Sequence, residues 1–235
     1  MKNTFSPKID YAAEIKHVKE VMLFGTANFA FWQNKLREEN LSPYCIDGKA
    51  AILLSATELK YMGLKFRELI CSVYTNDPQK ADVPNGFFLV HAFNSSRLFA
   101  FSERTMFQTP YYHGQVEVNT KIPASFRLND GHGVVLNAKM SGVIPCSRRE
   151  DQVWEGPIYL PKSIAKETGA YFFAKLGGES QVFPFSPSMD TLELKASSNT
   201  PALQWLIDSN FTGTEWRIRQ EAEHSKSKTY RGAFS

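Results

Sequence analysis

The segment SERTMFQTPYYHGQVEV, residues 102–118, holds the densest group of side chains that could transfer protons. Around a proline, just before a predicted strand, it gathers Glu103, Arg104, Tyr111, Tyr112 and His113. Phenols and an imidazole at the entrance of a strand could donate protons or hydrogen bonds to a substrate carbonyl. The alternative is an aromatic lid that packs on the core, with His113 at the surface.

Glu68 is a second candidate for acid–base chemistry. In the segment FRELICSV, strand alternation places Phe66, Glu68, Ile70 and Ser72 on one face. A carboxylate among such neighbours has a raised pKa unless a cation such as Arg104 offsets the lost hydration. Glu68 could then act as a general acid or base near neutral pH. Alternatively, the two charged groups form a buried pair that only fixes a strand against a helix.

The elements that must position these residues are mostly strands. Segments rich in Val, Ile, Leu and aromatic residues, separated by turn signals, begin at Lys49 and continue through most of the second half. We expect short helices over residues 31–39 and about 96–106, the latter capped by Ser95 or Ser96. Residues 11–20 are compatible with a helix, and residues 199–235 are expected to form a helical C-terminal extension. Many short strands with few helices predict an antiparallel barrel or sandwich with peripheral helices.

Length and composition restrict the class of protein. The 235 residues suit a single domain spanning residues 1–235, and 18 Phe with 9 Tyr argue against disorder. No apolar run is long enough to span a membrane, and the N-terminal segment lacks a signal sequence, so we expect a cytoplasmic protein without membrane contact. The net charge of +3 is spread out, which argues against a nucleic-acid partner. No nucleotide-binding motif or cysteine–histidine cluster occurs, so we expect neither a cofactor nor a metal.

Three segments in order resemble the acetoacetate decarboxylase superfamily. Residues 103–114 resemble the family's R-E-L-x-x-Y-P-K-K-x-G turn. The segment GLKFRELICSV resembles the family's aromatic-x-Glu segment and places Glu68 at the active-site glutamate. The segment VWEGP at residues 153–157 matches the family's W-x-G-P segment. The resemblance covers residues 36–194. It implies a closed, cone-like antiparallel β-barrel with helices outside and a small-molecule pocket inside.

The resemblance implies the residues of an active site and shows one difference from the family's pattern. Besides Glu68 and Arg104, it places a tyrosine of the 111–112 pair in the pocket, with His113, His91, Trp154 and Phe66 as further candidates for contact with substrate. His91 alternates onto one face with Leu89 and Phe93, where a hydrogen-bonded core histidine is the alternative. The family's first lysine forms a Schiff base with its substrate. Here Tyr111 and Tyr112 stand at the two lysine positions, and a phenol cannot form an iminium.

Three functions follow as hypotheses. The first is an enzyme that acts on a carbonyl-containing, keto-acid or polyketide-like small molecule by non-covalent acid–base chemistry: enolisation, dehydration, cyclisation or isomerisation. The second is a non-catalytic barrel that binds an apolar ligand. The third is a decarboxylase that uses a relocated lysine, with Lys139 in the VVLNAKM strand as the candidate. A homo-oligomer is compatible with all three.

Overall fold

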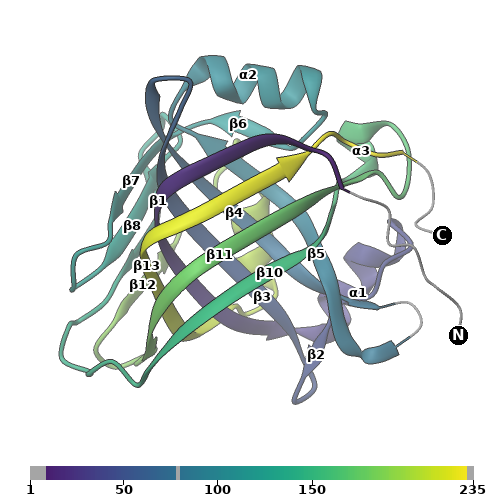
Figure 1. Cartoon of the computed structure of the whole chain (residues 1–235). Helices are drawn as coiled ribbons and strands as arrows, with labels where there is room; N and C mark the ends of the chain where they lie inside the picture. Colours follow the sequence, from purple (N-terminus) through teal and green to yellow (C-terminus); the bar gives the residue numbers. More distant parts are fainter. Residues whose placement is uncertain (1–8, 78–79, 232–235) are drawn as a thin grey trace, which may run out of the picture.

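The computed structural model describes residues 9–77 and 80–231, which fold mainly into strands (Figure 1). The strands are β1 Tyr11–Asn28, β2 Cys45–Ile46, β3 Lys49–Tyr61, β4 Leu64–Asp77, β5 Lys80–Asn94, β6 Tyr111–His113, β7 Gln115–Asn119, β8 Ser125–Asn129, β9 Val134–Lys139, β10 Arg148–Tyr159, β11 Tyr171–Pro184, β12 Thr191–Leu194 and β13 Thr212–Ser227. The helices are α1 Phe29–Arg37, α2 Arg97–Met106, α3 Lys162–Ala165 and α4 Pro201–Asp208. The mainly β fold predicted from the sequence is confirmed. No helix within the described ranges is long and apolar enough to cross a membrane.

The larger sheet is joined into a ring by its strand pairings. The order is β1-β13-β11-β10-β5-β4-β3, and β3 pairs back onto β1. One contact in this ring is short and parallel, between Ile158–Tyr159 of β10 and Phe87–Phe88 of β5, and β6 also runs parallel to β5. The expectation of purely antiparallel pairing is therefore wrong at these two places. Both parallel contacts involve β5, so this strand is the junction of the ring.

The ring has an interior face, because strands that do not pair with one another contact across it. The rings of Phe24 on β1 and Tyr74 on β4 lie 6.0 Å apart, although β3 separates their strands. Lys226 Nζ of β13 likewise lies 5.6 Å from the ring centroid of Tyr111 on β6. Side chains on this face therefore share one enclosed environment.

The largest apolar core lies on the opposite face of the ring. Here the second sheet, in the order β12-β9-β8-β7, packs along one side of the ring (Figure 1). Its buried residues Phe126, Leu128 and Leu136 belong to the same core as Leu54 and Leu69 of the ring. Because the largest apolar core lies on the outer face of the ring, the interior face can carry polar side chains.

Helices α1 and α2 confirm two sequence predictions and cover different parts of the ring. The amide N–H of Phe31 donates to Asn28 Oδ1 at the start of α1, which buries Trp32 and Leu36 one turn apart. Ser96 caps α2, as expected. The ring of Phe99 on α2 lies 4.4 Å from that of Phe66, so α2 lies across the end of the ring next to the β3–β4 hairpin (Figure 1).

Two segments expected to be helical are strands. Residues 11–20 form the first half of β1, which pairs with β13 from Tyr11↔Ser227 onward. The expected C-terminal helix TEWRIRQEAEH forms most of β13, which lies between β1 and β11. Long-range pairing outweighs local helix propensity here. Thr212–Ser227 is therefore part of the ring, whereas α4, Pro201–Asp208, confirms the first part of the expected C-terminal helical extension.

We predict that Gly86→Ala destabilises the ring at its parallel junction. A Cβ at position 86 would lie 2.3 Å from the backbone carbonyl oxygen of Pro157, which cannot move aside without breaking the β5–β10 contact. We expect the free energy of unfolding to fall by about 3 kcal/mol in chemical denaturation. The matched control is Gly177→Ala, where the nearest atom is a Val153 methyl group at 3.2 Å. Equal stability of the two variants would contradict the role given to this junction.

Candidate active site

A single row of cross-strand partners carries three of the charged residues of the interior. Going from strand to strand, Arg219 pairs with Glu20, Glu20 with Thr57, Thr57 with Glu68 and Glu68 with Asn94. Directly opposed residues point to the same side of a sheet. The register therefore places two carboxylates on one face with a threonine between them.

The Glu68 carboxylate is fixed by two side-chain donors. Asn94 Nδ2 donates to Glu68 Oε1 at 2.9 Å, and the Tyr111 hydroxyl donates to Glu68 Oε2 at 3.2 Å. Asn94 is itself fully buried, and its Oδ1 accepts the backbone N–H of Ser96 at 2.7 Å. This chain of hydrogen bonds ties the orientation of Glu68 to the N-terminus of α2.

The pKa of Glu68 is raised to about 7, first by burial and second by the nearby negative charge of Glu103. Lys226, the Tyr111 hydroxyl and His224 act in the opposite direction and keep the rise moderate. Burial and the same carboxylates raise the pKa of Tyr111 well above 10, so its hydroxyl stays protonated. At neutral pH the site thus contains a carboxyl group near its midpoint of titration and a phenol that remains a donor.

Lys226 of β13 is the cation of this site. Its ammonium group forms an ion pair with Glu103 Oε2, which also accepts a 2.8 Å hydrogen bond from Thr109 Oγ1. Lys226 Nζ lies 4.6 Å from the ring centroid of Phe172 and 4.8 Å from that of Phe107. The amine therefore combines one anionic partner with aromatic walls.

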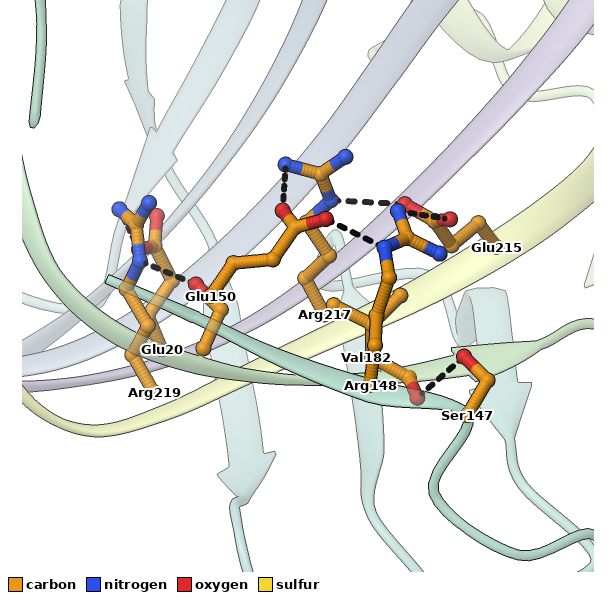
Figure 2. A network of polar contacts seen from close by, with 9 residues as sticks. Glu20, Ser147, Arg148, Glu150, Val182, Glu215, Arg217 and Arg219 are labelled. Atoms are coloured by element: carbon orange, nitrogen blue, oxygen red, sulfur yellow. Dashed lines mark hydrogen bonds and ion pairs between the residues drawn. The ribbon is translucent and has the colours of Figure 1, made fainter. Parts of the chain in front are cut away.

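A second ion pair, between Arg219 and Glu20, lies in the same cross-strand row as Glu68, and Figure 2 shows its two residues. Arg219 donates to Glu20 at 3.3 Å, Ser55 donates to the same carboxylate at 2.7 Å, and His224 Nε2 lies 3.6 Å away. Burial alone would raise the pKa of Glu20, but these neighbours outweigh it and lower the pKa to about 2. Glu20 is thus a permanent carboxylate, in contrast to Glu68.

Two hydroxyl groups on the interior face have no hydrogen-bond partner in the described part of the chain. They are Thr57 Oγ1, which lies between the two carboxylates, and Ser72 Oγ. Thr57 is 6% exposed and Ser72 is 1% exposed. A buried hydroxyl without a partner costs roughly 1–3 kcal/mol. Such atoms indicate that the interior is built to contact something polar, either water or a ligand.

The end of the ring away from α2 opens into a cavity of about 510 Å³. Phe24, Tyr74 and Arg217 form part of its wall. Figure 2 shows that Arg217 belongs to a network with Arg148, Glu150 and Glu215. The Arg217 guanidinium also lies 4.6 Å from the ring centroid of Phe24. The cavity at this end therefore has a charged and aromatic wall.

The structure brings Glu68 and Tyr111 together but places the other predicted polar residues elsewhere. Tyr111 pairs with Ala92 on the interior face, so Tyr112, paired with Phe93, points to the opposite face. His91 stacks on Tyr112 at a centroid distance of 4.4 Å, and the Arg104 guanidinium lies 4.5 Å from the same ring. The expectation that these side chains share one pocket is wrong, because neighbouring strand residues face opposite sides.

The expectations for four residues need correction. A bulge between Leu89 and His91 turns His91 away from the face of Leu89, and His113 is exposed. Arg104 is also exposed, and the cation near Glu68 is Lys226 instead. Lys139 is exposed on β9 in the second sheet and cannot replace an interior lysine.

Phe66 and Trp154 lie at the margins of the interior. Phe66 is buried against Phe99 of α2, at the covered end. Trp154 is half-buried and packs edge-to-face on Phe87 at 4.7 Å. Both have a packing role here, and contact with a substrate stays a prediction.

Sequence reasoning missed five interior residues. They are Asn94, which donates a hydrogen bond to Glu68, and Glu20, Arg219, His224 and Lys226. Four of these five interior residues lie in segments that were expected to be helical. The signal that could have found the strand is the alternation of Trp216 and Ile218, which are buried, with Arg217 and Arg219. Within the described residues, no group of histidine, cysteine and acidic side chains is arranged to hold a metal ion.

Comparison with known proteins identifies the fold. No family model and no curated protein sequence matches the chain. A solved structure of acetoacetate decarboxylase matches with a TM-score of 0.62 and 12% identity over 96% of this chain and 91% of that one. This chain has the acetoacetate decarboxylase fold. The acetoacetate decarboxylase of Legionella pneumophila matches with a TM-score of 0.60 and 12% identity, over 97% of this chain and 94% of that one. An acetoacetate decarboxylase-like enzyme from Sphingomonas wittichii matches with a TM-score of 0.59 and 10% identity, over 98% of this chain and 99% of that one.

We predict that the two neighbours of Glu68 move its pKa in opposite directions. Glu103→Gln removes a negative charge and should lower the pKa of Glu68 by about one unit, whereas Lys226→Met removes a positive charge and should raise it. The measurement is the carbon-13 NMR titration of the Glu68 carboxyl group. Glu117→Gln, at an exposed carboxylate paired with Arg127 on the second sheet, should leave the titration unchanged. Shifts in the same direction for both site variants would contradict this geometry.

Proposed function

We propose that the chain is an enzyme that transfers protons next to the carbonyl group of a small substrate, bound inside a cone-like barrel formed by the strand ring. The observation that carries the proposal is the Glu68 carboxyl group, with a pKa of about 7 and the Tyr111 hydroxyl 3.2 Å away. The fold neighbours named above are enzymes, which supports a catalytic role.

In this proposal Glu68 is the general base. Its carboxylate removes a proton from the carbon next to the carbonyl, and the electron pair moves onto the carbonyl oxygen to give an enolate. The Tyr111 hydroxyl turns from Glu68 toward that oxygen and donates a hydrogen bond, which stabilises the developing negative charge. Glu68 then returns the proton to the same carbon or to another atom, which gives enolisation, isomerisation, dehydration or cyclisation. No imine is formed on the tyrosines at positions 111 and 112.

Binding of a polar substrate is supported by groups around Glu68. The hydroxyl groups of Thr57 and Ser72 would donate hydrogen bonds to oxygen atoms of the substrate. Apolar side chains such as Ile70 and Phe172 line the same face and exclude water, which strengthens electrostatic interactions in the site.

The test is exchange of carbon-bound protons with deuterated water, followed by proton NMR over a panel of ketones and keto acids that includes acetone and acetoacetate. The enzyme should accelerate exchange of at least one compound, and the rate should rise with pH through about 7, because the base form of Glu68 is required. Glu68→Gln should lower the rate by about 100-fold or more. Tyr111→Phe should lower it by about 10-fold or more.

The matched control is Tyr112→Phe, an identical change at the adjacent residue on the opposite face, which should retain the rate. Binding of the panel without any exchange would overturn the proposal in favour of a non-catalytic binder. Exchange that survives in Glu68→Gln would exclude this residue as the base.

A second candidate function, decarboxylation through a relocated lysine, is favoured by the position of Lys226. Its amine lies among aromatic rings on the side of the site where Tyr111 holds Glu68. After transfer of a proton from its ammonium group to Glu103, the amine could attack the carbonyl of a β-keto acid and, with loss of water, form an iminium. The electron pair of the broken carbon–carbon bond would then move into the iminium as carbon dioxide leaves, and the protonated form of Glu68 would protonate the resulting enamine.

Borohydride reduction in the presence of acetoacetate separates the two candidates. If the second is correct, peptide mass spectrometry finds a reduced adduct on Lys226, and Lys226→Arg abolishes it. The exposed Lys139 is the internal control and should carry no adduct. Proton exchange without a Lys226 adduct would reject the decarboxylase and leave the acid–base enzyme.

A further inference from the structure

A second, larger cavity lies outside the ring, on the face of β5 opposite to Glu68. Its volume is about 990 Å³, at the upper end of the range for small-molecule sites. The wall is built from β5, β6 and the helices α1, α3 and α4. Phe88, Phe93, Tyr112 and Trp205 give it several aromatic surfaces. The backbone of β5 separates this cavity from the site described above.

His91 is the polar group buried in this wall. It is 7% exposed, and its ring is stacked between those of Phe93 at 4.7 Å and Tyr112 at 4.4 Å. Its Nε2 atom has no hydrogen-bond partner in the described part of the chain. An imidazole nitrogen buried without a partner is costly, so a ligand that supplies the missing hydrogen bond gains affinity.

The charge state of His91 restricts what it can contact. Burial, together with the positive charge of Arg104, lowers the pKa of His91 to about 4. The ring is therefore neutral at pH 7, and its Nε2 can share one hydrogen bond with a hydroxyl group, which donates or accepts as the imidazole tautomer requires.

The cavity rim has unpaired positive charge. Lys162 Nζ lies 3.6 Å from Glu38, and its backbone N–H donates to Glu39, so these acidic residues have partners. Lys35 and Arg37 form no ion pair among the residues described, and Lys35 Nζ lies 4.5 Å from the ring centroid of Trp205. These two unpaired cations beside an aromatic surface favour an anionic group on a flat ligand, while the third acidic residue of the wall, Asp130, accepts a hydrogen bond from the Ser197 hydroxyl.

We propose that this outer cavity is a second binding site, for a planar aromatic carboxylate that carries a hydroxyl group. The aromatic body lies against Phe93, Tyr112 and Trp205, the hydroxyl group bonds His91 Nε2, and the carboxylate faces Lys35 and Arg37. The site is independent of the chemistry proposed for Glu68.

Three matched probes test the proposal by isothermal titration calorimetry: 6-hydroxy-2-naphthoate, its carboxamide, and 2-naphthoate without the hydroxyl group. The hydroxynaphthoate should bind most tightly, and loss of either the charge or the hydroxyl should weaken binding about 10-fold. His91→Phe keeps an aromatic ring in the stack but removes Nε2. It should weaken hydroxynaphthoate binding to the level of naphthoate and leave naphthoate binding unchanged.

The charge requirement has its own variants. Lys35→Gln combined with Arg37→Gln should remove the preference for the carboxylate over the carboxamide, whereas Lys121→Gln, at an exposed lysine elsewhere, should retain it. Glu68→Gln should bind all three probes as the unaltered protein does. Equal affinity for acid and amide in the unaltered protein would overturn the proposal even if His91→Phe fails to fold. Loss of binding in Glu68→Gln would also overturn it, by placing the probes inside the ring.

Discussion

The structure depends on the neutralisation of carboxylates that the strand register places inside the ring. Glu20 and Glu68 occupy one cross-strand row, and burial penalises the charged form of both. β13 supplies the compensating groups, because Arg219 and His224 lie beside Glu20 while Lys226 pairs with Glu103 and acts on Glu68. The neighbours of Glu20 outweigh the cost of its burial, whereas those of Glu68 offset that cost only in part. That difference gives one carboxylate a structural role and leaves the other able to exchange protons near neutral pH.

The same strand alternation separates two sites that the sequence presents as one. Tyr111 and Tyr112 are adjacent, yet β6 directs the first toward Glu68 and the second toward His91. The interior site has hydroxyl groups, a titrating carboxyl group and a lysine. The outer cavity has stacked rings and a neutral imidazole. A thin layer of backbone, the β5–β6 pair, divides an environment suited to proton transfer from one suited to binding a flat ligand.

Much of the fold could be predicted from the sequence, because its signals are local. Alternation in FRELICSV placed Glu68 on the correct face with Ser72, and the serine cap located α2. The role of β13 could not be predicted from composition, since TEWRIRQEAEH has helix-forming residues and becomes a strand only between β1 and β11. The sequence also could not show which of Tyr111 and Tyr112 faces the interior. This depends on which of them lies opposite Ala92, and that is set by the pairing of β6 with β5, a contact between separate segments of the chain.

The most direct test of the central claim is a crystal structure of the Glu68→Gln variant soaked with acetoacetate, since a variant that cannot take up the proton should retain its ligand. The account predicts the ligand inside the strand ring, with its ketone oxygen hydrogen-bonded to the Tyr111 hydroxyl and its remaining oxygen atoms near Thr57, Ser72 or Lys226. Acetoacetate bound only in the outer cavity, with the interior filled by water alone, would contradict it.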